Sequence, residues 1–283
     1  MRIVIKFAGA LLEDASVVAS LSQHVATLSR HRHEILVIHG GGRLFTATLK
    51  RLGIESKFVS GLRVTDRETR DVAVMVFGGL LNKKLAAAIT AAGQPAIGIS
   101  ASDSTSFSAA PLVHNEVEGS LGFVGYLTGV NVPFLESLWR EKLLPVAACL
   151  GLGPDGELYN INADHMAAAC AEFIGADHLI YLTDVAGVLR GENVISAISC
   201  EQIGSLVHSR VVSGGMVLKL EAARRALEGG VREVHIVGGD AAAAVLDPHL
   251  FSTPTGKTSF SDLPGTRVLR NFSFPGHASS AVV

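Results

Sequence analysis

Two short segments place glycines beside a polar or charged side chain, a combination that can bind phosphate. In the first, His39-Gly40-Gly41-Gly42 ends an apolar run and opens a helical pattern. Three consecutive glycines cost conformational entropy, and a tight strand-to-helix turn needs only one or two. Backbone N–H groups at such a helix start form an anion site. In the second, Lys6 precedes Ala8 and Gly9, which suits a phosphate but equally suits a Lys snorkelling from a strand end.

Polar side chains stand before or at the start of three other helical patterns. The Arg63 guanidinium could hold a carboxylate through two parallel hydrogen bonds, although a surface Arg is commoner. Asn160, Asn162 and Asp164 lie within five residues; a helix cap needs one of them, so the surplus indicates groups directed at a ligand. We expect Lys219 in the first turn of a helix, where a cation is unfavourable by roughly 0.3–1 kcal/mol. A bound phosphate would reverse that sign.

Three familiar motifs are incomplete. Gly256-Lys257-Thr258 resembles the end of a P-loop, but position 251, where the motif needs Gly, is Phe. The glycines of 151–156 have dinucleotide-fingerprint spacing, but a turn and a short strand are expected after them in place of a helix. His31 and His33 lie in a polar connection, and the eleven histidines show no HxxxH or HExxH spacing. We therefore predict no protein-ligated metal site.

The elements that position these segments alternate between strand and helix. Short apolar runs without a period-2 pattern predict buried parallel strands at Ile3–Phe7, Ile35–His39, Pro95–Ser100, Leu144–Leu150, Leu179–Thr183 and Glu233–Val237. Helical spacing predicts helices at Leu44–Arg51, Asp66–Ala92, Val132–Lys142, Ala163–Ile174 and Met216–Glu228. This alternation predicts an α/β fold, a three-layer α/β/α sandwich with a mainly parallel central sheet. Ligands bind such sheets beyond the carboxyl ends of the strands, where the segments above fall.

Three further segments carry local predictions. Thr65 with Glu68 three residues later has the pattern of a capping box that opens the helix Asp66–Ala92. The Gly-rich stretch Leu112–Val130 predicts one or two hairpins. With no linker that separates domains, residues 1–271 are expected to form a single domain, and residues 272–283 a flexible tail.

Composition limits the class of protein. Of 283 residues, 48% are hydrophobic and 18% charged, the formal net charge is -2, and no Lys/Arg run is present, so we expect no nucleic-acid partner. Mean hydropathy is +0.38, yet no uninterrupted apolar stretch approaches the ~20 residues of a membrane span. Cys149, Cys170 and Cys200 lie far apart and form no CxxC pair. Reduced thiols and a start unlike a signal peptide predict a cytoplasmic protein without a membrane partner.

Taken together and in order, the segments resemble the acetylglutamate kinase family of the amino acid kinase superfamily. The resemblance runs from Ile3 to about Gly239. It rests on Lys6-Phe7-Ala8-Gly9, His39-Gly40-Gly41-Gly42, Gly61-Leu62-Arg63-Val64-Thr65, Tyr159-Asn160-Ile161-Asn162-Ala163-Asp164, Leu182-Thr183-Asp184-Val185 and Gly215-Met216-Val217-Leu218-Lys219. One position departs from the family pattern Lys-x-Gly-Gly, since Ala8 replaces the first Gly. If the family uses positive φ there, Ala8 would alter how the phosphates are held.

The resemblance implies a reaction in which ATP, with Mg²⁺ held mainly by the nucleotide, phosphorylates the side-chain carboxylate of N-acetyl-L-glutamate. That carboxylate is already ionised, so no general base is needed, and alignment and charge stabilisation carry catalysis. The implied catalytic residues are Lys6, Lys219 and Asp164. The implied substrate-binding residues are Gly41, Gly42, Arg63, Asn160 and Asn162, and the implied nucleotide-binding residues are Gly9, Thr183, Asp184, Gly187, Leu189 and Ser213. An N-lobe of about 1–175 would hold the acyl amino acid and a dimer face, and a C-lobe of about 176–271 the nucleotide.

The resemblance also carries expectations about assembly and two alternatives. Arginine-sensitive family members have an extra helix before the first strand; here Lys6 lies five residues after Met1, so we expect a homodimer without arginine feedback. Met75, Phe77 and Leu81 are the residues expected to pack against the partner. The alternatives are an aminoadipate-type kinase of lysine synthesis and a non-catalytic module that senses nucleotide or amino acid.

Overall fold

The computed structural model describes residues 1–113, 121–251 and 263–270. Its centre is an eight-stranded sheet with the order β14-β16-β15-β11-β1-β2-β8-β5, in which each neighbouring pair is parallel except β15 and β16. The strands are β1 (Arg2–Phe7), β2 (Glu34–His39), β5 (Ala96–Ile99), β8 (Leu144–Ala148), β11 (His178–Thr183), β14 (Ala197–Ser199), β15 (Glu233–Gly238) and β16 (Thr266–Leu269). The mainly parallel sheet that the apolar runs predict is confirmed.

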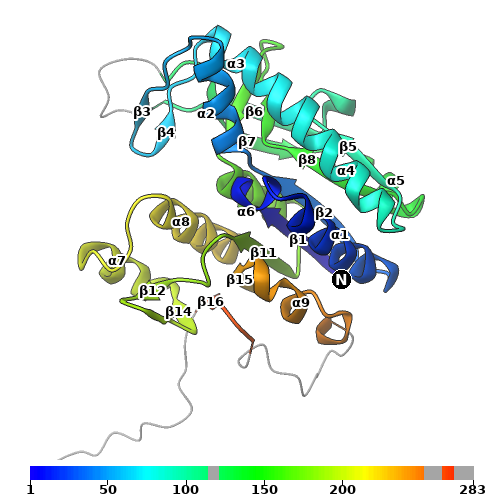
Figure 1. Cartoon of the computed structure of the whole chain (residues 1–283), viewed down its shortest axis with the longest axis vertical. Helices are drawn as coiled ribbons and strands as arrows, with labels where there is room; N and C mark the ends of the chain where they lie inside the picture. Colours follow the sequence, from blue (N-terminus) through cyan, green and yellow to red (C-terminus); the bar gives the residue numbers. More distant parts are fainter. Residues whose placement is uncertain (114–120, 252–262, 271–283) are drawn as a thin grey trace, which may run out of the picture.

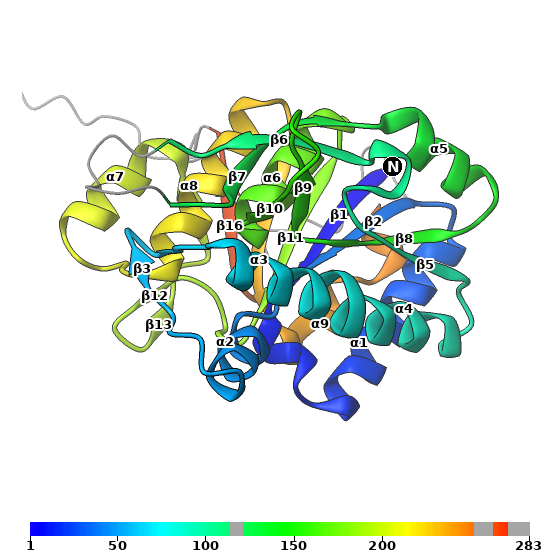
Figure 2. The same ribbon diagram turned by 90° about the horizontal axis from the view of Figure 1, so that it is seen from above.

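Helices cover both faces of this sheet, so the three-layer prediction is also confirmed (Figures 1 and 2). One core lies between the sheet and α1 (Ala15–Arg30), α4 (Asn82–Ala91) and α9 (Ala242–Val245). The other lies on the opposite face and is filled by α2 (Gly42–Arg51), α3 (Arg67–Ala73), α5 (Val132–Arg140), α6 (Ala163–Phe173), α7 (Cys200–His208) and α8 (Gly215–Glu228). Single 3-10 turns are η1 (Gly9–Leu12), η3 (Asp103–Thr105), η4 (Gly239–Ala241) and η5 (Pro248–Phe251).

The pleat of β1 determines which face of the sheet carries the buried side chain of Lys6. Ile3, Ile5 and Phe7 pack into the core with α1, whereas Val4 packs into the opposite core. Because side chains alternate along a strand, Lys6 lies on the same face as Val4. Its side chain is therefore on the side of the sheet that α6 and α8 cover.

A small closed barrel of β10-β7-β6-β9 stands beside the main sheet. Its strands are β6 (Phe107–Pro111), β7 (Val124–Val130), β9 (Leu150–Leu152) and β10 (Leu158–Ile161), and two hairpins, β3 (Phe58–Val59) with β4 (Leu62–Arg63) and β12 (Leu189–Arg190) with β13 (Asn193–Val194), complete the strands. The predicted hairpin starts earlier than expected, at Phe107. The predicted strand Leu144–Leu150 is interrupted at Cys149, where the chain leaves the main sheet for the barrel.

The long helix predicted at Asp66–Ala92 is present, with two corrections. It runs through α3, a π-helical stretch η2 (Val74–Leu81) and α4. Its N-cap is Asp66, whose carboxylate accepts from the N–H of Thr69, so the predicted Thr65 capping box is wrong. The Thr65 hydroxyl instead donates to the carbonyl of Arg63.

The same helix is apolar enough, by length and composition, to cross a membrane, with a mean hydropathy of 1.6 in its most apolar window. Half of that window is buried inside the protein. Phe77 and Leu81, two of the residues predicted to meet a partner, are buried in this chain, which corrects that prediction. Met75 and Leu80 remain 58% and 46% exposed.

Three predicted features fall partly or wholly on residues that the structure does not describe. They are the middle of the 112–130 hairpin, the Gly256-Lys257-Thr258 segment and the tail from 272 to 283. The division into an N-lobe and a C-lobe stays a prediction, and one sheet runs through both halves. The glycines of 151–156 lead through a turn into β10, as expected.

Candidate functional site

A cavity of about 250 Å³ lies at the carboxyl ends of β1 and β2, against the start of α6. Polar, small and apolar residues from sequence-distant segments line it. They include Lys6, Gly9, Gly40, Gly41, Gly42, Phe45, Phe58, Gly61, Leu62, Arg63, Phe77, Cys149, Asn160, Asn162 and Asp164. The structure thus brings together eight of the predicted site residues: two catalytic residues, all five substrate-binding residues and one nucleotide-binding residue, Gly9.

Two lysines share one carboxylate oxygen at this site. The Lys6 Nζ lies 2.7 Å from the Asp164 Oδ1, and the Lys219 Nζ lies 2.9 Å from the same oxygen. The three side chains are 8%, 7% and 13% exposed for Lys6, Lys219 and Asp164. Tyr181 contacts two of these residues. The Lys219 Nζ lies 4.7 Å from the centroid of the Tyr181 ring, and the Tyr181 hydroxyl donates to the Asp164 carbonyl at 3.0 Å. This buried group carries a net positive charge that can receive phosphate.

The charges perturb each other's protonation. Burial alone would raise the pKa of the Asp164 carboxyl, but the ammonium groups of Lys6 and Lys219 outweigh it and hold that pKa well below its ordinary range. Burial, followed by repulsion from Lys6, lowers the pKa of Lys219 to about 8 against the attraction of Asp164. Burial also raises the pKa of the Cys149 thiol to about 12, so this cavity-lining thiol stays protonated and is a poor nucleophile.

Lys219 corrects one step of the sequence reasoning. It is the fifth residue of α8, in the second turn rather than the first. The unfavourable helix-dipole position inferred from the sequence therefore does not hold. In the structure, the anion beside Lys219 is Asp164 from α6.

Arg63 is held in place by neighbours that carry no charge. Its guanidinium donates to the hydroxyls of Ser56 and Thr46, the latter at 2.6 Å. It also lies between two rings, 4.8 Å from the Phe45 centroid and 4.4 Å from the Phe58 centroid. Among the described residues, no carboxylate forms an ion pair with it. A fixed, half-buried and uncompensated guanidinium is suited to a carboxylate ligand.

Asn160 and Asn162 have different local tasks. Asn162 is the N-cap of α6, and its Oδ1 accepts from the N–H groups of Asp164 and His165 at 2.9 and 3.1 Å. Asn160 lies on β10, and its amide donates to the Thr65 hydroxyl at 3.1 Å. The capping explanation therefore accounts for Asn162, while Asn160 remains as the surplus polar group beside the cavity.

Glycines let two backbone segments meet at the cavity. A Cβ on Gly9 would lie 2.7 Å from the Gly41 Cα, which no side chain can tolerate without a backbone shift. Gly42 begins α2, and no hydrogen bond from its N–H or that of Gly41 is found within the described part of the chain. These donors at a helix start form the anion site that the glycine run predicts.

Ala8 is accommodated without strain. Its φ is -65° and its ψ is 143°, an extended conformation that any residue adopts, and its N–H donates to the Leu182 carbonyl at 2.9 Å. The expectation that Ala8 disturbs a positive-φ position does not apply to this backbone.

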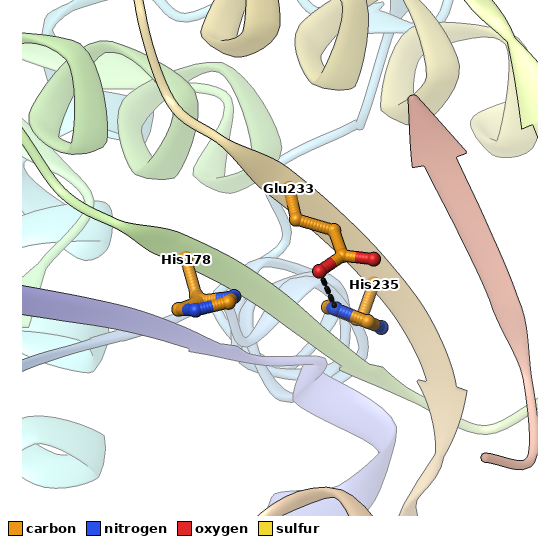
Figure 3. Close-up of side chains that lie close together, drawn as sticks. All are labelled: His178, Glu233 and His235. Carbon is orange, nitrogen blue, oxygen red and sulfur yellow. Dashed lines mark ion pairs between the residues drawn. The ribbon is translucent and has the colours of Figure 1, made fainter. Parts of the chain in front are cut away.

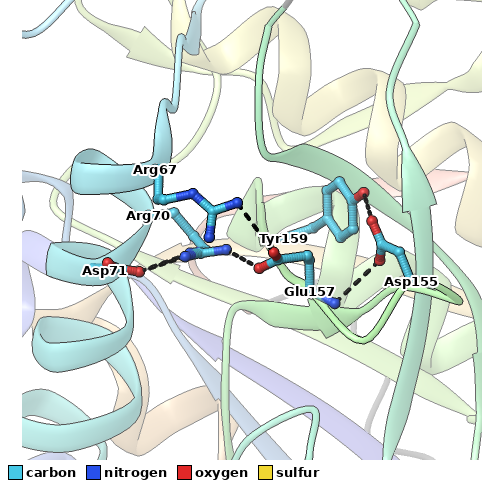
Figure 4. Close-up of polar contacts among 6 residues, drawn as sticks. All are labelled: Arg67, Arg70, Asp71, Asp155, Glu157 and Tyr159. Atoms are coloured by element: carbon cyan, nitrogen blue, oxygen red, sulfur yellow. Dashed lines mark hydrogen bonds and ion pairs between the residues drawn. The ribbon is translucent and has the colours of Figure 1, made fainter.

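A polar network fixes the β9–β10 turn against α3 (Figure 4). Arg70, which is buried, donates to Glu157, and Arg67 reaches the other oxygen of Glu157 at 3.3 Å. The Tyr159 hydroxyl donates to Asp155 at 2.8 Å. Because Asn160 follows Tyr159 on β10, this network holds the strand that presents Asn160 to the cavity.

The predicted nucleotide-binding residues other than Gly9 do not line this cavity. Thr183 is buried at the end of β11, and Asp184 pairs with Arg43 at 3.3 Å. Gly187 packs closely against β16, where a Cβ would lie 2.8 Å from the Thr266 hydroxyl. Leu189 and Ser213 are exposed. Their nucleotide role stays a prediction.

Sequence reasoning missed the residues that shape the cavity around Arg63. Phe45, Thr46, Ser56 and Phe58 lie in α2 and the segment after it. None of the four is a glycine or a charged residue, the types on which the sequence reasoning relied. The helical spacing of Phe45 and Leu49 signals a buried face but does not distinguish a core ring from a cavity wall.

Comparisons with known proteins decide the family. The model of the amino acid kinase family matches residues 1–238. The chain belongs to the amino acid kinase family. Similar curated relatives are the acetylglutamate kinase of Koribacter versatilis, 49% identical over 90% of this chain and 96% of the relative, and that of Acidobacterium capsulatum, 43% identical over 87% and 94%. The predicted family is confirmed.

A solved structure supports the same fold. The N-acetylglutamate synthase of Neisseria gonorrhoeae, complexed with coenzyme A and N-acetyl-glutamate, superposes with a TM-score of 0.80 at 22% identity. It covers 96% of this amino acid kinase chain, which spans only 60% of that protein. At this identity the likeness shows the fold alone.

Proposed function

We propose that this chain is an acetylglutamate kinase, which transfers the γ-phosphoryl group of ATP to the side-chain carboxylate of N-acetyl-L-glutamate and yields ADP and an acyl phosphate for arginine biosynthesis. One observation carries the proposal. A single cavity is lined both by Arg63, which has no carboxylate partner among the described residues, and by the buried Lys6–Asp164 pair that also binds Lys219. The relatives' identity of up to 49% among those compared supports it.

Each group has a role that its surroundings support. Arg63 binds the substrate's α-carboxylate with help from Asn160. The Arg63 guanidinium is held in place by its neighbours, and no carboxylate among the described residues pairs with its charge. Lys6 and Lys219 stabilise the negative charge of the transferring phosphoryl group, and Asp164 fixes both ammonium groups. The N–H groups near Gly41 and Gly42 donate to the same phosphoryl oxygens.

The side chains around the cavity fit a Mg²⁺ ion that is held mainly by ATP. Asp164 is the carboxylate among the cavity-lining residues, and its Oδ1 already contacts two ammonium groups. Mg²⁺ commonly keeps few protein ligands and binds substrate phosphates. Its chemistry here would be to neutralise charge on the phosphates of ATP.

The protein is further proposed to be a cytoplasmic homodimer. Met75 and Leu80, on the long helix, are 58% and 46% exposed, and a twofold contact is the commonest oligomer. Light scattering should give a dimer for the wild type and a monomer for Met75→Glu. Leu52→Glu, at a 56% exposed position elsewhere, is the matched control and should remain dimeric. A dimeric Met75→Glu variant would place the interface on another surface.

One assay tests the function. Release of ADP is measured with acetylglutamate, with an aminoadipate-type substrate and with no acceptor. Release that depends on acetylglutamate supports the proposal. Preference for the longer substrate would favour the lysine-synthesis alternative, and ATP binding without turnover would favour a sensing module.

A further inference from the structure

Three buried ligand-type side chains gather at the amino ends of β11 and β15, away from the cavity (Figure 3). His178 opens β11 and is paired in register with Glu233 on β15. His235 lies two residues after Glu233, so it points to the same face of the sheet. Residues 178 and 235 are 57 positions apart, and only the parallel pairing of these strands brings their imidazoles together.

The spacing of the three side chains is close to that around a metal ion. Their potential ligand atoms all lie within 4.8 Å of one another, and the His235 Nε2 is 3.6 Å from the Glu233 Oε2. That separation exceeds an ordinary hydrogen bond. Ligand atoms on a tetrahedral ion with bonds of about 2.0–2.1 Å lie about 3.4 Å apart. A separation of up to 4.8 Å therefore has to close by up to about 1.4 Å for both atoms to bind one ion.

A neighbouring Arg orients the carboxylate. The Arg267 Nε lies 2.5 Å from the Glu233 Oε1, which leaves Oε2 on the side of His235. Carboxylates that bind a metal are usually held in this way by a hydrogen-bonding partner outside the ligand set. The positive charge of Arg267 also opposes a cation, so we expect affinity below that of a dedicated four-ligand structural site.

We propose that His178, Glu233 and His235 form a binding site for a divalent transition-metal ion of the zinc type. Two imidazoles and one carboxylate suit Zn²⁺ better than Mg²⁺ or Ca²⁺, which prefer oxygen ligands throughout. His178 is five residues from Thr183 at the opposite end of β11, roughly 16 Å along the strand. The ion would therefore join β11 to β15 and take no part in phosphoryl transfer.

The test uses metal-free full-length protein. Zn²⁺ affinity is measured by competition with a chromophoric chelator, and Co²⁺ is added separately as a spectroscopic probe. We expect one equivalent of Zn²⁺ and visible Co²⁺ absorption typical of a four- or five-coordinate nitrogen and oxygen site. Glu233→Gln and His235→Gln should each bind Zn²⁺ at least about tenfold more weakly. The exposed His208→Gln variant is the matched control and should bind as the wild type does.

Two results would overturn the site. One is unchanged Zn²⁺ affinity in folded Glu233→Gln and His235→Gln, with folding checked by circular dichroism. The other is wild-type protein whose Co²⁺ spectrum lacks these bands or shows the thiolate charge-transfer band of a cysteine ligand. The wild-type spectrum decides alone if a variant fails to fold.

Discussion

Replacement of Lys219 with methionine should stabilise the protein while removing most of its kinase activity. The Lys219 side chain is 7% exposed, and burial together with repulsion from Lys6 lowers its pKa to about 8 in spite of Asp164 at 2.9 Å. A fall from the ordinary 10.5 to about 8 corresponds to roughly 3 kcal/mol at 1.36 kcal/mol per pKa unit. Methionine keeps the chain length and loses the charge, and Lys6 still neutralises Asp164. Because the surroundings on balance disfavour the charged form of Lys219, we expect the free energy of unfolding to rise by about 1–3 kcal/mol at pH 7.

The pH dependence has a defined sign. Between the folded pKa of about 8 and the ordinary value of 10.5 in the unfolded chain, the unfolded chain binds more protons than the folded one. The titration of Lys219 should therefore make the wild-type protein more stable as the pH rises across this range. Below this range, the charge state of Lys219 does not change, so this group adds no pH dependence. The variant lacks that rise, so its advantage should be largest near pH 7 and shrink towards pH 10.

Urea unfolding without ATP, followed by circular dichroism at pH 7.0 and pH 9.5, measures both effects. The exposed Lys84→Met variant is the matched control and should show neither. A coupled ADP assay should show kcat lowered by about 10²–10³-fold for Lys219→Met. A loss of this size is typical when an enzyme loses one hydrogen-bond donor to the charge that develops in the transition state. A variant less stable than the wild type at pH 7 would mean that the attraction to Asp164 dominates, and an unchanged kcat would remove Lys219 from the mechanism.

The other predictions concern Arg63, Gly9 and Ala8. Arg63→Lys should raise KM for acetylglutamate about tenfold or more and leave KM for ATP unchanged, because the bidentate geometry of the guanidinium is lost; Arg140→Lys, at an exposed position away from the cavity, is the control, and a rise on the ATP side alone would contradict the assignment. Gly9→Ala should abolish most activity in steady-state assays, since its methyl would meet the Gly41 backbone at 2.7 Å; full activity would show that the two segments can separate. Ala8→Gly should leave kcat within about twofold and lower stability by about 0.5–1 kcal/mol in urea unfolding, because φ is already -65°; an inactive variant would show that the methyl itself is needed.

Local patterns were sufficient to predict the layers of the fold and many residues of the site. Continuous apolar runs specify parallel strands covered on both faces, as β1 and β2 show. Parallel strands bring their carboxyl ends to one edge, so Lys6 and the glycines of 40–42 could be assigned to a common site before their positions were known. A glycine is also required where two backbone segments approach too closely for a Cβ atom. The close approach of Gly9 to Gly41 is therefore visible in the sequence as a glycine.

Sequence patterns could not specify which side chains meet across the fold. Only the packing of α6 and α8 on β1 brings Lys6 and Lys219 to one oxygen of Asp164, and the resulting burial sets their charges against each other. The rings of Phe45 and Phe58 enclose Arg63 in the same way, although their spacing alone indicates core residues.

Sequence by itself determined the sheet and the residue types available at its edge, because these follow from periodicity and local backbone demands. The family was indicated separately, by the resemblance of six ordered segments to a known family. Tertiary structure decided the N-cap at Asp66, the interior position of Phe77 and the cluster of His178 with Glu233 and His235. Each of those depends on strand order and on contacts between residues far apart in the chain. Such contacts are fixed only when the whole core packs, and no short sequence window contains that information.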